Sequence, residues 1–284
     1  MRVTREATAA KTIASAVTDF EIDQLADSVL QLYRLNAPVD LARIAREEGI
    51  ELVGGNFGAD FHGRIEYLPD DGVFAVYHPE NLGEIFPGRV RFTIAHEFGH
   101  YFIPEHRDML LRDLVHDSAE DFRPDRQIER EADRFASALL IPAVVLRNKM
   151  GRKGFLSLKE IKAVGAECQT SLQAAAFRYT QFTSEPHLAI VSENRRILYY
   201  FVSEEANALG FGGLGNKTLP SDSPAVRALA SDRNIICEGE TNTEQWFSER
   251  YRRADLWDES INLGYNNRVL TLLSWQDYES ESDG

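Results

Sequence analysis

Two histidines and a glutamate in this sequence have the spacing of a metal site that activates water. His96, Glu97 and His100 form the pattern His-Glu-X-X-His. Residues four apart on a helix lie on the same face, so the two imidazoles would converge on one ion. Glu97 would project close enough to accept a proton from a water at that ion. The pattern predicts a zinc-dependent peptidase site, with His96 and His100 as ligands and Glu97 as the general base.

The surrounding residues favour a metal site over a pair of ordinary core histidines. Apolar side chains lie almost all round this segment: Ile94, Ala95, Phe98, Tyr101 and Phe102. A helix that is apolar on every side is buried, and buried imidazoles and carboxylates need partners. In the alternative interpretation, His96 and His100 hydrogen-bond to neighbouring carbonyl groups and bind no ion.

A catalytic zinc ion needs a third protein ligand and one open position, and a later segment provides the candidates. Glu129 and Asp133 share one face of a predicted helix, and the apolar residues on that face should pack it against the motif helix. Glu131 lies about 200° further round the helix. We therefore predict Glu129 as the third ligand and Glu131 as the fallback ligand. Asp133 is predicted to accept a hydrogen bond from a ligand histidine and so fix its tautomer.

The other histidines have weaker patterns. His106 and His116 follow the motif in a segment that we expect to be a loop, where they would stabilise an oxyanion or line the cleft. The alternative for both is an ordinary solvated side chain. His62, His78 and His187 have no pattern that supports a role.

Hydrophobic periodicity predicts an α+β domain around the motif. In chain order we expect helices over 20–33 and 39–48, strands over 50–53, 64–68 and 72–78, the motif helix over 87–102, a polar loop over 105–123 and a long helix over 125–140. Further on, we expect helices over 157–164 and 171–179 around a turn at Gly165, strands over 188–191 and 197–202 joined at Glu193-Asn194, a helix over 223–230, and strands over 234–238 and 269–275.

Composition and charge limit the class of protein. Hydrophobic residues make up 43% and charged residues 27%, a globular balance that argues against wholesale disorder. The net charge of -14 argues against a surface that coats nucleic acid or an anionic membrane. Two cysteines, the lack of a secretory pattern and the lack of an apolar run of about 18 residues predict a cytoplasmic protein without a membrane span. Residues 145–183 are locally basic, with seven Lys or Arg against two Glu.

Two separated blocks, Arg91 to His100 and Glu129 to Pro142, closely resemble the ImmA/IrrE family of bacterial and phage-associated metallopeptidases. The resemblance covers roughly residues 20–150. In that family the third zinc ligand is a Glu three residues before a small residue of the second block, which corresponds to Glu129. Family members often have a histidine four residues after the second ligand, where this sequence has Pro104.

The resemblance implies a zincin-like metallopeptidase core with a small sheet and two long helices over residues 1–150, binding one Zn²⁺ per chain. It also implies a helix-turn-helix-like segment over 151–185; residues 186–284 would form a C-terminal α/β domain that senses a signal or binds substrate. Such peptidases typically cleave a helix-turn-helix repressor of the XRE type, encoded nearby, and so derepress stress or mobile-element genes. DNA contact by the basic segment is the less favoured expectation.

Two other functions stay open at this point. One is a zinc-stabilised, DNA-binding regulator that has no turnover. The other is the effector of a toxin–antitoxin-like module, which would cut a different protein.

Overall fold

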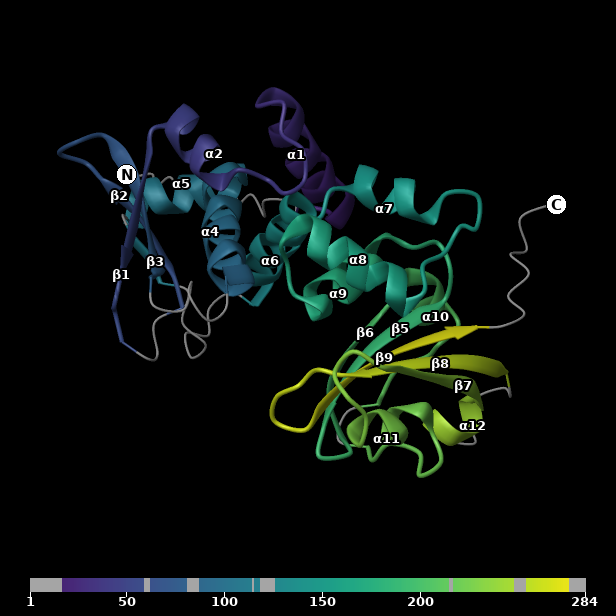
Figure 1. The fold of residues 1–284 in the computed structure, drawn as a ribbon. Helices are drawn as coiled ribbons and strands as arrows, with labels where there is room; N and C mark the ends of the chain where they lie inside the picture. Colours follow the sequence, from purple (N-terminus) through teal and green to yellow (C-terminus); the bar gives the residue numbers. More distant parts are fainter. Residues whose placement is uncertain are drawn as a thin grey trace, which may run out of the picture.

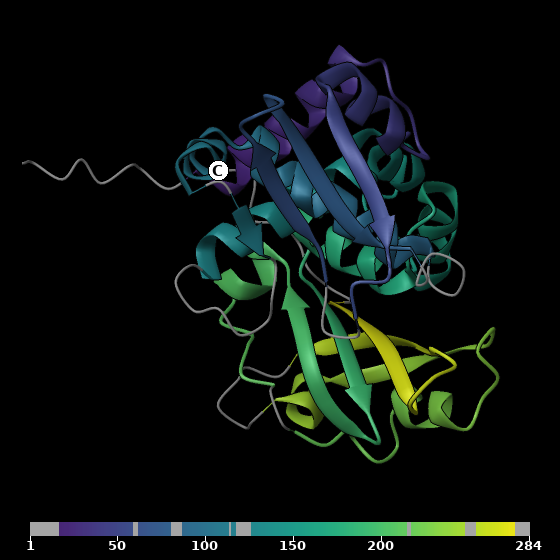
Figure 2. The same ribbon diagram turned by 90° about the vertical axis from the view of Figure 1, so that its left-hand side faces the viewer.

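The computed structural model describes residues 17–58, 62–80, 87–113, 115–117, 126–214, 217–247 and 254–275. Two β-sheets lie at opposite ends of the molecule, with helices between them (Figure 1), and Figure 2 shows the same separation from the side. The first half contains α1 (Asp19–Leu32), α2 (Leu41–Glu48), β1 (Ile50–Gly55), β2 (Arg64–Leu68), β3 (Val73–Pro79), α4 (Pro87–Phe102), α5 (Pro104–Asp113), β4 (Val115–Asp117) and α6 (Arg126–Leu140). The second half contains α7 (Ala143–Met150), α8 (Leu158–Cys168), α9 (Leu172–Phe182), β5 (His187–Glu193), β6 (Arg196–Val202), α10 (Glu204–Ala208), α11 (Pro224–Leu229), β7 (Ile236–Asn242), α12 (Thr243–Trp246), β8 (Asp255–Asn262) and β9 (Arg268–Trp275).

The first sheet is small and mixed, in the order β1-β3-β2-β4. β1 runs parallel to β3, whereas β2 pairs antiparallel with both β3 and β4. Ile65, Phe74 and Val76 on β2 and β3 are buried in the same hydrophobic core as Ile94 and Phe98 of α4. Burial of these apolar side chains fixes the motif helix against the sheet. The predicted α+β core, with a small sheet and two long helices, is confirmed in this coarse form.

Local sequence signals set the limits of several helices. Thr18 accepts a hydrogen bond from the backbone N–H of Glu21, and the Glu21 carboxylate accepts one from the backbone N–H of Thr18, which is a capping box at the start of α1. Gly49 ends α2 in the left-handed conformation, with φ of 69°. Ser157 and Glu160 form a second capping box at the start of α8. The two capping boxes explain where α1 and α8 begin, and Gly49 explains where α2 ends.

The α4–α6 contact depends on a glycine that faces an alanine. A Cβ atom built on Gly99 would lie 2.9 Å from the Cα atom and 3.1 Å from the carbonyl oxygen of Ala132. Side chains do not tolerate contacts this short, so the two helices can approach this closely only where a residue lacks a Cβ. The glycine inside the motif therefore lets α4 and α6 lie close enough to share one site.

We expect Gly99→Ala to push α4 and α6 apart. Inserting a methyl group into a tightly packed contact costs roughly 1–3 kcal/mol of folding free energy, and zinc affinity should fall as well, because the proposed ligands come from both helices. Thermal unfolding and a zinc titration measure the two effects. The control is Gly212→Ala, because a Cβ there would lie 3.8 Å from its nearest neighbour, the Tyr200 hydroxyl oxygen. Equal stability and zinc affinity in both variants would contradict this account of the helix contact.

The second sheet has the order β6-β5-β9-β8-β7, and every neighbouring pair is antiparallel. The predicted β5–β6 hairpin is confirmed, with Asn194 and Arg195 at φ of 48° and 69° in its turn. The expectation of an α/β domain was wrong for this region. Because an α/β sheet is mostly parallel and this one has no parallel pair, the C-terminal region is α+β.

Three other local predictions were wrong. Residues 104–113 form α5 rather than a loop, because Pro104 occupies the first position of a helix, where its missing N–H is not needed. Gly165 lies inside α8, and the turn before α9 falls at Gln169, which has φ of 53°. The pattern also missed α7 and β8.

The middle helices join both ends of the molecule. One hydrophobic core includes residues of α1, α4, α6, α8 and α9 together with Ala189, Leu270 and Leu272 on one face of the second sheet. A second core lies on the other face of that sheet and contains Ala225 and Ala228 of α11. The domain boundary predicted near residue 185 stays a prediction. The hydrophobic core continues across this point, because residues before it and after it belong to the same core. No helix among the described residues is long and apolar enough to cross a bilayer.

Candidate metal centre

Three side chains with metal-binding atoms meet where α4 crosses α6. His96 Nε2 lies 3.1 Å from His100 Nε2 and 3.2 Å from Glu129 Oε2, and His100 Nε2 lies 3.6 Å from Glu129 Oε1. One such atom from each residue lies within 4.8 Å of the others. Two imidazole nitrogens and one carboxylate oxygen are a donor set of catalytic zinc sites, which keep a fourth position for water or substrate. The residues present therefore fit a zinc ion.

Asp133 orients His96 from the side away from this cluster. Its Oδ1 lies 2.9 Å from His96 Nδ1. When Nδ1 donates this hydrogen bond, the lone pair of Nε2 is directed toward His100 and Glu129. Burial lowers the pKa of His96, but the hydrogen bonds to Asp133 and Glu129 and the charge of Glu97 outweigh it and raise this pKa to about 10. The surroundings of His96 thus favour a positive charge at this point.

Glu97 is fully buried beside the cluster, and a glycine makes room for it. A Cβ atom on Gly63 would lie 2.5 Å from Glu97 Oε1 and 2.6 Å from Thr93 Cγ2. The segment before β2 therefore passes directly over the Glu97 carboxylate. The Thr93 hydroxyl donates a hydrogen bond of 3.2 Å to the carbonyl oxygen of His62 and holds that segment in place.

Glu131 and His106 form a separate pair. Glu131 Oε2 lies 2.9 Å from His106 Nε2, and the Gln127 side chain donates to Glu131 Oε1 at 2.9 Å. Glu131 is not in the His96 cluster, so the structure gives no support to its use as the fallback ligand. His106 lies on α5, is 2% exposed, and its ring centroid is 5.1 Å from that of His100. It is thus a buried neighbour of His100 rather than a loop residue in the cleft.

The remaining histidines divide between the site and the rest of the fold. His116 lies on β4, where its backbone pairs with that of Ile65 on β2. The side chain of His116 lies outside the described part of the structure. Arg89, near the start of α4, donates a hydrogen bond from its guanidinium group to His62 Nδ1, at 2.9 Å. Sequence reasoning missed Gly63 and His62, because a glycine and a histidine in an irregular segment have no periodicity that would place them beside α4.

Residues 86–180 match the family model of the IrrE N-terminal-like domain, Peptidase_M78. The chain contains an ImmA/IrrE-family metallopeptidase domain. The family predicted from the two sequence blocks is confirmed. The match begins at α4 and includes α8 and nearly all of α9, so it ends further along the chain than the resemblance over roughly residues 20–150 and the core predicted over residues 1–150.

Two curated relatives have the same description. The chain is 25% identical over 207 residues to the radiation response metalloprotease IrrE of Deinococcus radiodurans, a match that covers 65% of this chain and 61% of the relative. It is 26% identical over 168 residues to the protein of the same description from Deinococcus deserti, covering 53% and 59%. The chain therefore spans about three fifths of the length of these ImmA/IrrE relatives.

A solved structure shares the fold over most of the chain. It is described as a Mycobacterium tuberculosis transcriptional regulator, with a TM-score of 0.58 and 15% identity. The match covers 90% of this chain and 76% of that one. At this identity the likeness concerns the arrangement of the elements alone.

Proposed function

We propose that this ImmA/IrrE homologue is a zinc-dependent endopeptidase that cuts a protein substrate at a specific site. The observation that carries the proposal is the cluster of His96, His100 and Glu129, with the buried Glu97 beside it. The family match and the curated relatives described as metalloproteases support the same activity.

In this proposal His96, His100 and Glu129 hold one zinc ion. Zinc in such a site supplies Lewis acidity, which polarises a substrate carbonyl group and acidifies water. Glu97 accepts the proton from the attacking water and returns it to the leaving amine. Asp133 holds the His96 ring in the orientation that ligation needs. The Gly63 backbone lies against the Glu97 carboxylate and leaves it little room to change its orientation.

For the substrate, we extend the proposal to a helix-turn-helix repressor of the XRE type, whose cleavage would derepress stress or mobile-element genes. The support is the description of the curated relatives as radiation response metalloproteases. Cleavage of a repressor would link such a peptidase to a change in gene expression. An effector role in a toxin–antitoxin-like module would use the same chemistry on another protein.

DNA binding without turnover receives less support from the packing of α9. Every residue of α9 from Leu172 to Phe182 is buried or half-buried. Phe177 stacks on Phe201 of β6 with ring centroids 4.0 Å apart, and Gln173 donates to the Tyr199 hydroxyl at 3.0 Å. A helix that reads the major groove must present exposed side chains along one face. In the helix-turn-helix-like pair α8–α9, the second helix, α9, instead packs against the C-terminal sheet.

Zinc content tests the metal centre directly. Wild-type protein should hold about one zinc per chain, and His96→Ala or Glu129→Ala should lose most of it, because each removes one of three ligands. Glu131→Ala is the matched control on the same helix, since Glu131 pairs with His106 and should leave zinc in place. Elemental analysis of the four proteins after gel filtration measures this. Little zinc in wild type, or equal loss in the two glutamate variants, would contradict the proposed ligand set.

A further inference from the structure

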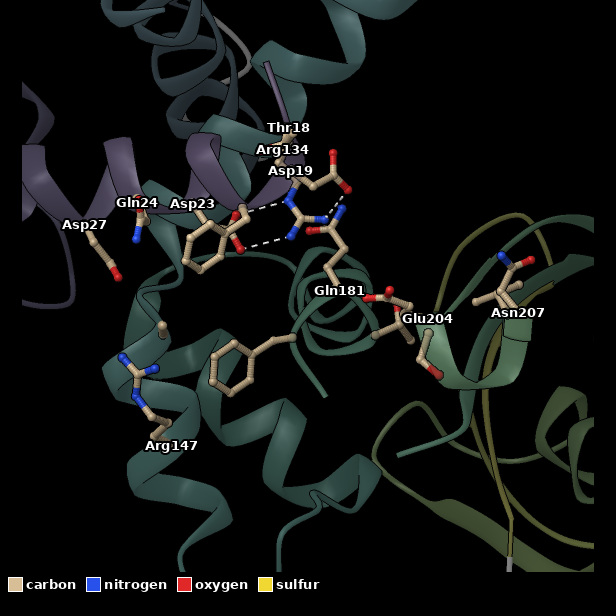
Figure 3. A pocket seen from close by; sticks show the side chains of 16 residues that line it. Thr18, Asp19, Asp23, Gln24, Asp27, Arg134, Arg147, Gln181, Glu204 and Asn207 are labelled. Atoms are coloured by element: carbon tan, nitrogen blue, oxygen red, sulfur yellow. Dashed lines mark hydrogen bonds and ion pairs between the residues drawn. The ribbon is translucent and has the colours of Figure 1, made fainter. Parts of the chain in front are cut away.

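A cavity lies away from the metal centre, where α1, the α6–α7 helices, α9 and α10 meet (Figure 3). Its volume is about 840 Å³, which lies within the usual range for ligand sites of about 300–1,000 Å³. Asp19, Phe20, Arg147 and Glu204 on its lining are exposed, so the cavity opens to solvent. Its walls come from residues 18–27, 134–147 and 180–207, so the cavity lies where helices of the first half of the chain meet the start of the C-terminal region.

The charge of the cavity is not balanced by its own residues. Arg134 is held by Asp19 at 2.8 Å and by Asp23 at 2.9 Å, as the dashed lines in Figure 3 show. Asp27 and Glu204 form no ion pair with any described residue. Figure 3 shows these two carboxylates well apart, Asp27 on α1 and Glu204 at the start of α10. The lining therefore carries four carboxylates against the two guanidinium groups of Arg134 and Arg147, and Asp27 and Glu204 are the two carboxylates without an ion pair to a described residue.

Aromatic side chains also line the cavity, and they suit a ligand side chain that carries a cation on an apolar stem. Phe20 is 68% exposed, and the guanidinium of Arg147 lies 5.7 Å from the centre of the Phe182 ring. The chain's own Arg147 thus shows that this wall accepts a guanidinium by a cation–π contact. Gln181 Oε1, also in the lining, is buried and accepts no hydrogen bond from a described residue.

We infer that this cavity binds a basic segment of the protein substrate, with Asp27 and Glu204 each pairing with a Lys or Arg side chain. The inference rests on the proposed function, because it places a second contact for the substrate outside the metal centre. A peptide fits better than a compact cation, since two carboxylates that lie well apart require two separated charges with apolar stems between them. Such a contact would restrict cleavage to proteins that carry a suitably placed basic segment.

Binding is measured with the full chain carrying Glu97→Gln, so that the ligand is not cut. The probe is a fluorescein-labelled peptide of alternating arginine and alanine, compared by fluorescence anisotropy with its twin in which glutamate replaces arginine. The arginine peptide should bind and the glutamate peptide should not. Adding Asp27→Asn and Glu204→Gln should weaken binding about tenfold, which is the effect of losing two partly exposed charge pairs.

The control pair is Glu244→Gln with Asp255→Asn, which changes the net charge equally at exposed positions outside the cavity. It should leave peptide binding unchanged. Equal loss in both double variants, or equal binding of the two peptides, would overturn the inference, as would displacement of the arginine peptide by spermidine at comparable concentration. These outcomes do not depend on cleavage, so wild-type protein that cuts nothing would overturn the proposed function and leave the binding result to be judged separately.

Discussion

Replacing Glu97 with glutamine should abolish cleavage of the protein substrate while the chain keeps its fold and its zinc. Glutamine has the shape of glutamate, so it fits the space beneath Gly63, but its amide cannot accept the proton from water. A positioned general base contributes roughly 10²–10⁴-fold to the rate, and we expect a loss in this range. The measurement is co-expression with candidate XRE-type repressors, scored for one discrete cut and followed by elemental analysis of the purified variant.

Glu105→Gln is the matched control, because Glu105 is an exposed glutamate on the neighbouring helix α5. It should cut at the wild-type rate. If Glu97→Gln also cuts at the wild-type rate, Glu97 is not the base. If neither wild type nor variant cuts any repressor but both alter its regulation, the chain acts as a binding protein, and the endopeptidase proposal fails.

The side-chain cluster of the candidate metal centre was predictable where it depends on helix geometry. The spacing of His96 and His100 requires one shared face, and the same rule separates Glu129 and Asp133 from Glu131. In the structure Glu129 and Asp133 both approach His96, whereas Glu131 approaches His106. A periodicity of 3.6 residues thus carries enough information to sort three carboxylates within five residues.

The parts of the site that depend on irregular backbone were not predictable. Gly63 lies in a segment without regular structure, and its position against Glu97 follows from how β2 packs on α4. The sequence predicts a loop at His106 because a proline, here Pro104, commonly ends a helix, although proline is equally suited to the first turn of a helix. Sequence alone does not distinguish these two uses of proline when a polar stretch follows.

The missed strand β8 shows a different limit. Its interior residues Asp258, Glu259 and Ser260 are buried, although their types are those of a solvated loop. Burial raises the pKa of Asp258 to about 7, and the Ser260 hydroxyl donates to it at 2.6 Å. Glu259 accepts from the backbone N–H of Leu158 at the start of α8. Partners from distant elements make this strand possible, and no local pattern predicts them.

The same dependence on distant partners makes Asp23 important for stability. Asp23 on α1 accepts hydrogen bonds from Arg134 and, at 3.0 Å, from Arg178 of α9, whose side chain is 1% exposed. Burial lowers the pKa of Arg178, and the charge of Asp23 opposes this effect. We expect Asp23→Asn to destabilise the fold by about 3 kcal/mol, because it leaves a buried guanidinium without its counter-charge. Asp23 is itself 23% exposed, so water offsets part of the loss.

Asp19→Asn separates this effect from the loss of any ion pair on α1. Asp19 also pairs with Arg134, but its side chain is 76% exposed, and removing such a pair costs about 1 kcal/mol or less. Denaturant unfolding of both variants at neutral pH measures the difference. Adding Arg178→Met to Asp23→Asn should recover part of the stability, since the buried charge is then gone together with its partner. Equal destabilisation by the two aspartate variants would show that the burial of Arg178 does not make Asp23 more important to stability than Asp19.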